Sequence, residues 1–340
     1  MHAGLHVAGI GMVTAIGDDT HSTIVGLAAG SRRIRRAQLC DLAGERISGA
    51  FAFPVRAEHE GFARASVLAW PALVECLDEL GPARGPTALI ACTPLPWGGR
   101  AGREAGTGSP AYDNWPVVLD ALATEIETRG ATVPEALRIL IRRGHAGGFL
   151  ALRAAAQMFE RGEAAQVVIV GLDTHGEPAT LEHLDRMGLL RSRRSPGGFL
   201  PGEAAAVLCV RPSPVRDRGV CVRGVGIEVE TQVPSSARAM AAAVAQAVDA
   251  WGGDSAAIGA VAIDLNGENQ RQKEWCCAAT QTIYRRHATP VLLHPADRLG
   301  DIGAASVPLL VGLVVSAQTP GPALVVASSR DGLRGAAIVV

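Results

Sequence analysis

Apolar and polar positions along the chain form two alternating kinds of segment. Short runs rich in Val, Ile and Leu are followed by longer, alanine-rich stretches with helical spacing. The short runs are apolar at consecutive positions, which is typical of strands covered by helices on both faces of a sheet. We therefore predict ten strands, at residues 5–14, 86–94, 136–144, 165–173, 204–212, 220–230, 260–266, 289–295, 323–330 and 336–340.

The stretches between these runs predict helices. They lie at residues 20–29, 62–80, 115–128, 147–161, 236–251, 270–287 and 303–317. Such alternation favours an α/β fold in which helices pack on sheets. With 340 residues, of which 48% are hydrophobic, the chain is long enough for one large domain or for two fused halves.

Four sequence landmarks occur twice, in the same order. The pairs are HVAGIGMVT with CVRGVGIEV, TALIACTP with AVAIDLNG, GHAGGFLALRAA with GDIGAASVPLLVGL, and VVIVGLDTHG with LVVASSRDG. The shared order predicts a duplication, with an N-terminal half at 1–212 and a C-terminal half at 213–340. The polar, proline-containing segment RPSPVRDRG at 211–219 is the expected connection.

Charge and composition exclude several classes of function. The formal net charge is −1 and aromatic residues make up 4%, so nothing favours nucleic acid or an anionic membrane as a partner. The N-terminus has no signal-peptide pattern, and no apolar stretch reaches the length of a membrane span. Seven scattered cysteines without a CxxC pair indicate reduced thiols in a cytoplasmic protein, with no zinc site. We expect no cofactor.

Four segments together resemble one enzyme family. VAGIGMVTAIG opens like a TGxGxVTxxG pattern, LIACTPLPWGG like a GTGxGG strand and loop, and GGFLPGEAAAVLCV like a DGFxxGEGAGxLVL segment. AGGFLALRAAAQMFERGEAAQVVIVGLD is similar to a nucleophile turn with its helix and following strand. The sequence thus resembles the β-ketoacyl-ACP synthases, which have the thiolase fold, over nearly the whole chain. The resemblance implies duplicated βαβαβαββ halves in an α-β-α-β-α arrangement of layers.

The family's catalytic residues are replaced in this sequence. In the family, a Cys at the turn before a helix attacks an acyl thioester, and two His residues in later loops assist. The resemblance places His145 at the nucleophile position, Asn266 at the first His position and Asp301 at the second, while Glu203 matches a supporting residue. An amide cannot shuttle protons, and a carboxylate would repel a developing oxyanion. We therefore predict that condensation chemistry is lost while the family's fold is kept.

Other departures from the family also concern its substrate channel. The glycine-rich segment near the C-terminus of relatives, FGFGG, reads SRDGLRG here. Relatives also have a longer segment between the helix predicted at 303–317 and the strand predicted at 323–330. We therefore expect a shortened C-terminal half without a normal pantetheine tunnel.

A degenerate ketosynthase implies a non-catalytic scaffold, adaptor or accessory subunit. It could pair with an active ketosynthase, as chain-length-factor subunits do, or act as an accessory protein, like thiolase-like proteins in some type VI secretion effector gene sets. The enzymatic alternative is an acyltransferase or thioesterase in which Asp301 orients His145 as a general base. We expect a homodimer, or a heterodimer with an active ketosynthase, formed through the apolar strand at 136–144. Protein cargo and acyl carrier protein are further candidate partners.

Cysteines and one glycine-rich segment are further candidates for chemistry. Cys92, Cys276 and Cys277 could replace the nucleophile, although free Cys in a strand or helix is more typical of a small apolar residue. The segment PWGGRAGREAGTGSP at 96–110 lacks the spacing of a phosphate loop, so we interpret it as a surface or channel-rim loop.

Two basic clusters and two histidines have simpler interpretations. The runs at 31–36 and 191–198 are expected to be solvated, with an acidic partner protein as the alternative. His175 and His294 each follow a predicted strand and are expected to be turn or capping residues.

Overall fold

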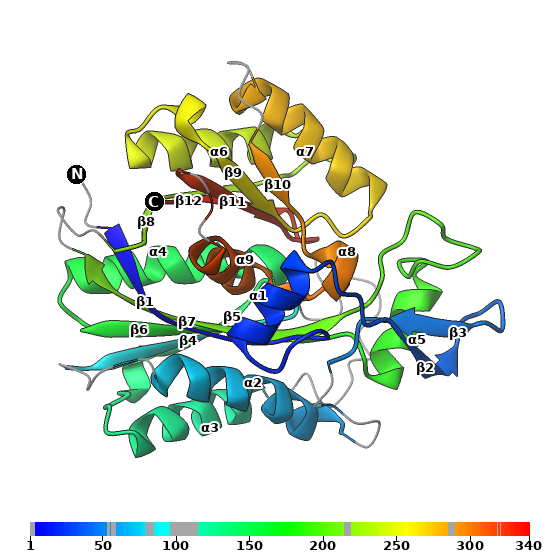
Figure 1. Cartoon of the computed structure of the whole chain (residues 1–340), viewed down its shortest axis with the longest axis horizontal. Helices are drawn as coiled ribbons and strands as arrows, with labels where there is room; N and C mark the ends of the chain where they lie inside the picture. The colour runs from blue at the N-terminus through cyan, green and yellow to red at the C-terminus, as the bar shows by residue number, and fades with distance from the viewer. Residues whose placement is uncertain are drawn as a thin grey trace.

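Five layers of helix and sheet make up the protein (Figure 1). The computed structural model describes residues 4–52, 55, 59–78, 80, 85–95, 115–213, 219–284, 290–317, 319 and 321–340. The glycine-rich segment at 96–110 lies outside the described residues. Helices α2 and α3 form one outer layer, α6 and α7 form the other, and α4 and α9 lie between the two halves of the sheet.

Ten strands form one continuous sheet, in the order β10-β9-β11-β12-β8-β1-β7-β6-β4-β5. The N-terminal half contributes β1 (Gly4–Val13), β4 (Thr87–Thr93), β5 (Arg138–Arg142), β6 (Gln166–Thr174) and β7 (Glu203–Ser213). The C-terminal half contributes β8 (Cys221–Val229), β9 (Ala260–Ile263), β10 (Val291–Leu293), β11 (Ala323–Ser328) and β12 (Leu333–Val339).

The helices connect these strands and cover their faces. They are α1 (Thr20–Ala28), α2 (Gly61–Asp78), α3 (Trp115–Thr128), α4 (Gly147–Glu160), α5 (Pro178–Arg186), α6 (Arg238–Trp251), α7 (Asn269–Thr282), α8 (Ala296–Leu299) and α9 (Ser306–Ser316). No helix in the described part of the chain is both long and apolar enough to cross a membrane.

The two halves of the sheet have the same topology. In each half, the first strand is followed in space by the fifth, the fourth, the second and the third. The two halves of the sheet join where β1 meets β8, at the residue pairs Leu5 with Val222 and His6 with Cys221, and the Val7 N–H also donates to the carbonyl of Val220 at 3.0 Å. This order confirms the predicted duplication and the α/β fold. The boundary between residues 212 and 213 stays a prediction.

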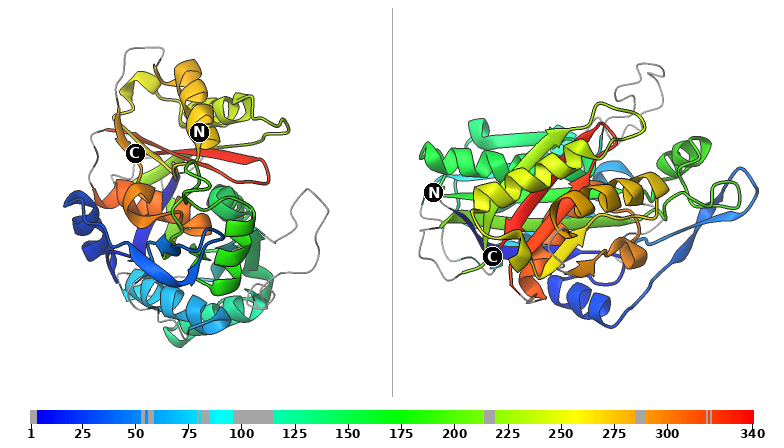
Figure 2. Two further views of the ribbon diagram at one scale, coloured as in Figure 1. Left: turned by 90° about the vertical axis from the view of Figure 1, so that its right-hand side faces the viewer. Right: turned by 90° about the horizontal axis from the view of Figure 1, so that it is seen from above.

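All ten predicted strands and seven predicted helices are present, but the sequence did not reveal a peripheral lobe. Strands β2 (Arg35–Cys40) and β3 (Arg46–Gly49) form a separate two-stranded sheet next to α5. Figure 2 shows this hairpin reaching beyond the layers. Its own small core contains Ile47, Leu184 and Phe199, which explains why it is ordered away from the main sheet.

The repeated glycines of the two opening strands have a steric role. A Cβ atom on Gly11 of β1 would lie 1.8 Å from the carbonyl oxygen of Ala72 in α2. The equivalent atom on Gly226 of β8 would lie 1.9 Å from the carbonyl oxygen of Ala243 in α6. Glycine at these positions lets the backbone of a helix approach the strand closely. The shared motif therefore sets the spacing of both outer layers.

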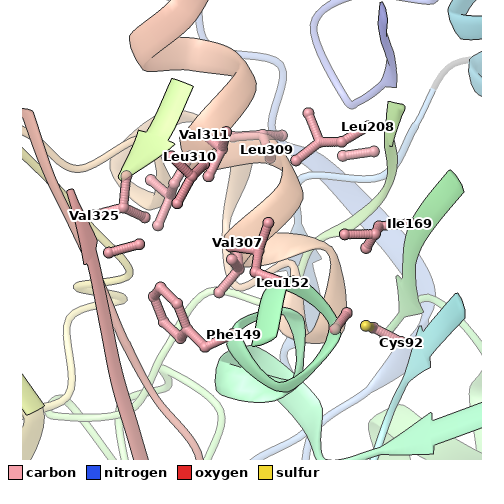
Figure 3. Close-up of a cluster of buried hydrophobic side chains, with 14 of the residues drawn as sticks. Cys92, Phe149, Leu152, Ile169, Leu208, Val307, Leu309, Leu310, Val311 and Val325 are labelled. Atoms are coloured by element: carbon pink, nitrogen blue, oxygen red, sulfur yellow. The ribbon is translucent and has the colours of Figure 1, made fainter. Parts of the chain in front are cut away.

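The middle layer is packed just as tightly. Every residue of α9 from Ser306 to Val314 is buried, and a Cβ atom on Gly148 of α4 would lie 2.6 Å from the Cβ atom of Val307. Figure 3 shows Phe149 and Leu152 of α4 pointing toward α9 and the surrounding strands. Burial of these apolar side chains is the main favourable contribution to the stability of this layer.

Adding one methyl group at the close approaches should test this packing. We expect Gly11→Ala and Gly226→Ala each to lower the free energy of unfolding by about 1–3 kcal/mol, because the new atom overlaps a helix backbone. Gly26→Ala in α1 is the control, since its nearest neighbour is the flexible end of Ile16 at 3.2 Å. It should leave stability unchanged or raise it, because alanine favours helix. Denaturant titration followed by circular dichroism measures all three, and full stability of Gly11→Ala would contradict the steric explanation.

Candidate functional site

Two equivalent turns lead into the central helices. After β5, Gly144 adopts a φ of +60° and starts a short 3-10 turn that contains His145 and runs into α4. After α8, Gly303 adopts a φ of +50° and starts the 3-10 turn that runs into α9, two residues after Asp301. Positive φ is accessible to glycine at little cost. The two turns contact each other, which brings residues 156 positions apart into hydrogen-bonding distance.

The carboxylate of Asp301 is the centre of a buried hydrogen-bond cluster. His145 Nε2 donates to its Oδ1 at 2.7 Å, and the backbone N–H of Gly303 donates to the same oxygen at 2.9 Å. Asn266 Nδ2 donates to Oδ2 at 2.6 Å. Both oxygens are thus occupied by donors from three separate turns of the chain, so this carboxylate holds the three turns together.

The side-chain amide of Asn266 is hydrogen-bonded at both its nitrogen and its oxygen. Its Nδ2 also donates to Glu268 Oε2 at 3.0 Å, while its Oδ1 accepts the backbone N–H of Glu268 at 3.1 Å. Because carboxylates only accept hydrogen bonds, these partners fix the orientation of the amide. Asn266 therefore serves as a brace between Asp301 and Glu268.

Electrostatics favour the ionised form of Asp301. Burial alone would raise its pKa, but the charge and hydrogen bond of His145, together with the charges of His175 and Arg271, hold the pKa well below its ordinary value. The pKa of Glu268 is also lowered, because Arg271, Arg330 and the Asn266 hydrogen bond outweigh its burial.

Two neighbouring carboxyl groups behave in the opposite way. Burial raises the pKa of Asp173, even though His175 and the backbone N–H of Ala304 act against it. Burial likewise raises the pKa of Asp264, despite its ion pair with Arg271. One oxygen of each group has no hydrogen-bond partner among the described residues. Ionisation of Asp173 and Asp264 is therefore unfavourable in the folded protein, whereas ionisation of Asp301 is favoured.

The space left around the cluster is small. His145, Asp264, Asn266, Asp301 and Ser306 line a cavity of about 10 Å3, together with apolar residues that include Ala296 of α8 and Leu310 of α9. Such a volume holds at most one water molecule. Ser306 supplies a hydroxyl group to the lining of this cavity, but its Oγ donates to the carbonyl of Gly303 at 2.7 Å and makes no hydrogen bond with His145 within the described structure.

Glu203 belongs to a separate buried cluster. Its side chain is completely buried and accepts hydrogen bonds from Arg64 Nε at 2.9 Å, Thr174 Oγ1 at 2.7 Å and the backbone N–H of Ala52 at 2.9 Å. The neighbouring Gly202 N–H donates to the carbonyl of Asp301 at 3.0 Å. Glu203 therefore ties α2, β6 and β7 together, one residue away from the backbone that holds Asp301.

Three residues make contacts around the cluster that the sequence did not predict. His175 Nδ1 hydrogen-bonds the carbonyl oxygen of Asp301 at 2.9 Å, so it is more than a turn residue. Ser329 Oγ accepts the Ala146 N–H at 2.8 Å and donates to the carbonyl of Arg143 at 2.5 Å, which braces the turn that carries His145. Glu268 pairs with Arg330 at 2.6 Å. All three contacts cross the fold, and no local pattern signals them.

The Glu268–Arg330 pair separates two open clefts. Glu268 lines both a cleft of about 360 Å3 on the side of α8 and a cleft of about 730 Å3 on the side of the β11–β12 turn. Asp331 in the β11–β12 turn also forms an ion pair with Arg143, which follows β5. Neither cleft includes His145 in its lining.

The candidate cysteines lie outside this cluster. Cys92 is fully buried, points into the middle layer in Figure 3, and has its pKa raised by burial to about 12. That environment keeps it a protonated core residue, as the sequence predicted. Cys276 and Cys277 are exposed on α7, where the sequence suggested an apolar packing role instead. Across the described residues, no His, Cys, Asp and Glu side chains are grouped to hold a metal ion.

Opposite pKa shifts predict opposite pH effects of two substitutions. The lowered pKa of Asp301 stabilises the fold above the ordinary pKa of an aspartate, about 3.9, and this contribution disappears as pH falls further. We expect Asp301→Asn to lower stability by about 1–3 kcal/mol at pH 7, because the new amide turns an N–H toward another donor. The deficit should shrink below about pH 4.

Asp173→Asn is the counterpart. Because burial raises the pKa of Asp173, ionisation of this group costs folding free energy at neutral pH. The stability of the variant relative to wild type should therefore rise as pH increases from about 4 to 8. Thermal melts of wild type and both variants across this range measure both slopes, and parallel melting curves would contradict the assignment.

Comparisons with known proteins agree on the fold. No protein-family profile and no curated protein sequence matches the chain. Among solved structures, the ishigamide ketosynthase/chain length factor is similar over 99% of both chains, with 16% identity and a TM-score of 0.74. The complex of the ketosynthase ApeO with its chain length factor ApeC from Xenorhabdus doucetiae gives 16% identity and a TM-score of 0.72, over 99% of this chain and 98% of that one.

A third similar structure contains a carrier protein. It is AntDE:AntF, a type II polyketide synthase acyl-carrier protein in complex with its ketosynthase bound to the hexaketide. It covers 100% of this chain and 99% of that one, with 13% identity and a TM-score of 0.75. With the duplicated topology and the five layers, these similarities show that the chain has the thiolase-like fold of the ketosynthases.

Proposed function

We propose that the chain is a non-catalytic ketosynthase-like subunit that acts by pairing with another chain, in the manner of a chain length factor. The observation that carries this proposal is the Asp301 cluster. Its carboxylate oxygens are occupied by His145, Asn266 and the backbone of Gly303, and the adjoining cavity of about 10 Å3 admits no acyl thioester.

The chemistry of the cluster supports the same conclusion. Condensation needs a nucleophile that holds an acyl chain and donors that stabilise a developing oxyanion. Here, an anion of the protein itself, Asp301, already occupies the donors His145 and Asn266. A second negative charge at this point would be repelled in a buried environment. The cluster therefore stabilises the native structure in a place where an enzyme would stabilise a transition state.

The proposed pairing surface is the edge strand β5. It is the last strand of the sheet, and all five of its residues, including Ile139, Leu140 and Ile141, are only half-buried. An unpaired apolar edge is an aggregation hazard unless another chain or element covers it. Two of the similar structures are themselves ketosynthases associated with a chain length factor. We infer that β5 pairs with a second chain, either a copy of this one or an active ketosynthase.

An acyltransferase or thioesterase remains the second candidate function, because one observation favours it. The hydrogen bond between His145 Nε2 and Asp301 Oδ1 is the arrangement by which a carboxylate orients an imidazole as a general base. Ser306 lines the same cavity and would supply a hydroxyl group on which this base could act. The small volume of the cavity and the hydrogen bond from Ser306 to Gly303 make this function less well supported than the first.

Activity measurements separate the two proposals. We expect wild-type protein to show no acyl adduct by intact-mass spectrometry after incubation with acyl-CoA, and no turnover above background with malonyl thioesters. His145→Cys should acquire an alkylatable thiol at the start of α4 without gaining condensation activity, since residues that act together are not restored singly. Turnover by wild type that His145→Ala or Ser306→Ala abolishes would replace the subunit proposal with the acyltransferase.

A charged substitution on the edge strand β5 tests assembly through this strand. We expect purified protein to have twice the mass of one chain by light scattering at micromolar concentration. Leu140→Asp should weaken this association at least tenfold, because a carboxylate would be buried in an apolar interface. Val117→Asp on the adjacent α3, where Val117 is 54% exposed, is the matched control and should leave the mass unchanged. A wild-type monomer, or equal effects of both substitutions, would contradict pairing through β5.

A further inference from the structure

The cleft beside α8 combines apolar walls with a basic rim. Its volume of about 360 Å3 lies in the range of small-molecule sites, about 300–1,000 Å3. Segments that are distant in the sequence meet around it: the connection from α1 to β2, the loop before β7, the loop after β9, and β10 with α8 (Figure 1). None of these residues belongs to the proposed pairing strand, so the cleft stands independently of the proposed function.

The walls of the cleft expose apolar side chains to solvent. Ile34 is 41% exposed and Leu292 is 39% exposed, and Leu200 and Leu265 line the same cleft. Large aliphatic side chains at a concave surface lose unfavourable contact with water when an apolar group covers them. The cleft therefore favours a ligand with an apolar body.

The rim supplies positive charge that the protein does not neutralise. Arg32 is held in place by a hydrogen bond from its Nε to the carbonyl of Asp297 at 3.1 Å. Arg191 also lines the cleft, from the loop before β7, and its backbone N–H donates to the carbonyl of Phe199 at 2.8 Å. Within the described part of the chain, neither guanidinium forms an ion pair with a carboxylate.

The acidic residues of the cleft are already paired. Asp297 forms an ion pair with Arg298 at 3.1 Å, and Glu268 forms one with Arg330 at 2.6 Å. The charge that remains at the rim therefore comes from Arg32 and Arg191. Guanidinium groups bind carboxylates through paired N–H donors, which gives both affinity and orientation.

Two polar residues limit the space that a ligand can occupy in the cleft. Asn266 lines it with its amide fully bonded, and Glu268, which is paired with Arg330, lines both this cleft and the larger one. A ligand would thus rest on the apolar walls and leave its charged end at the rim, without reaching His145.

From this arrangement we propose that the cleft binds a small amphipathic carboxylate, with its aliphatic chain against Ile34, Leu265 and Leu292 and its carboxylate between Arg32 and Arg191. The binding is reversible and involves no covalent step. It gives the chain a ligand-binding role that neither condensation chemistry nor pairing through β5 requires.

Calorimetric titration with octanoate, and with 1-octanol as the neutral analogue, tests the proposal. We expect octanoate to bind wild-type protein at least tenfold more tightly than 1-octanol, a difference of about 1.4 kcal/mol. The double variant Arg32→Gln/Arg191→Gln should lose at least tenfold in affinity for octanoate and little for the alcohol. Arg161→Gln, at an exposed ion pair with Glu163 away from the cleft, is the charge control.

A second pair of variants tests the apolar walls. Leu292→Asp should abolish octanoate binding, whereas Val291→Asp, one residue earlier on β10, should keep it, because Val291 is 51% exposed but does not line the cleft. Both positions are exposed, so neither change should unfold the protein, and circular dichroism checks this. Absence of binding by wild type, equal affinity for octanoate and octanol, or equal effects of the two β10 variants would each overturn the proposal. None of these results would alter the tests of pairing through β5.

Discussion

Face-to-face packing of α4 and α9 between the two halves of the sheet is the constraint on which the rest of the molecule depends. Gly148 and Val307 approach too closely for any additional side-chain atom, so the two helices have one relative position. Each helix starts directly after a tight turn at a glycine with positive φ, and the turns must therefore meet. The contact between His145 and Asp301 follows from this packing, because one residue lies at each turn.

The two turns meet at a negatively charged side chain, the carboxylate of Asp301. Asp301 is ionised and saturated with donors, whereas Asp173 and Asp264 resist ionisation because burial dominates their surroundings. An oxyanion hole works by keeping donors free until charge develops on the substrate. Here the donors already bond a carboxylate of the protein, so the same positions contribute to the stability of the native structure.

Local patterns predicted the large elements well and the site only in part. Strands such as β6 and helices such as α4 are long apolar runs with glycine or polar boundaries, and their burial follows from composition. The β2–β3 hairpin was missed because its exposed positions are mostly polar or charged, so no apolar run marks it. Positions for His145, Asn266 and Asp301 came from the family resemblance, but their hydrogen bonds span 35 and 156 residues. Only tertiary packing determines such distances, and the same is true of Glu268 with Arg330.

The close contacts at Gly11, Gly148 and Gly226 also bear on how far the sequence can change while the fold is kept. Where a fold is specified by the absence of side chains at a few close approaches, most other positions are free to change as long as their volume and polarity are kept. Divergence can then erase statistical sequence similarity while leaving the backbone in place. The chain fits this description: it matches no family profile, yet its fold is similar to that of a ketosynthase/chain length factor over 99% of its length at 16% identity. At these three positions the fold is specified by a missing side chain, which a comparison of residue types registers only as a common glycine.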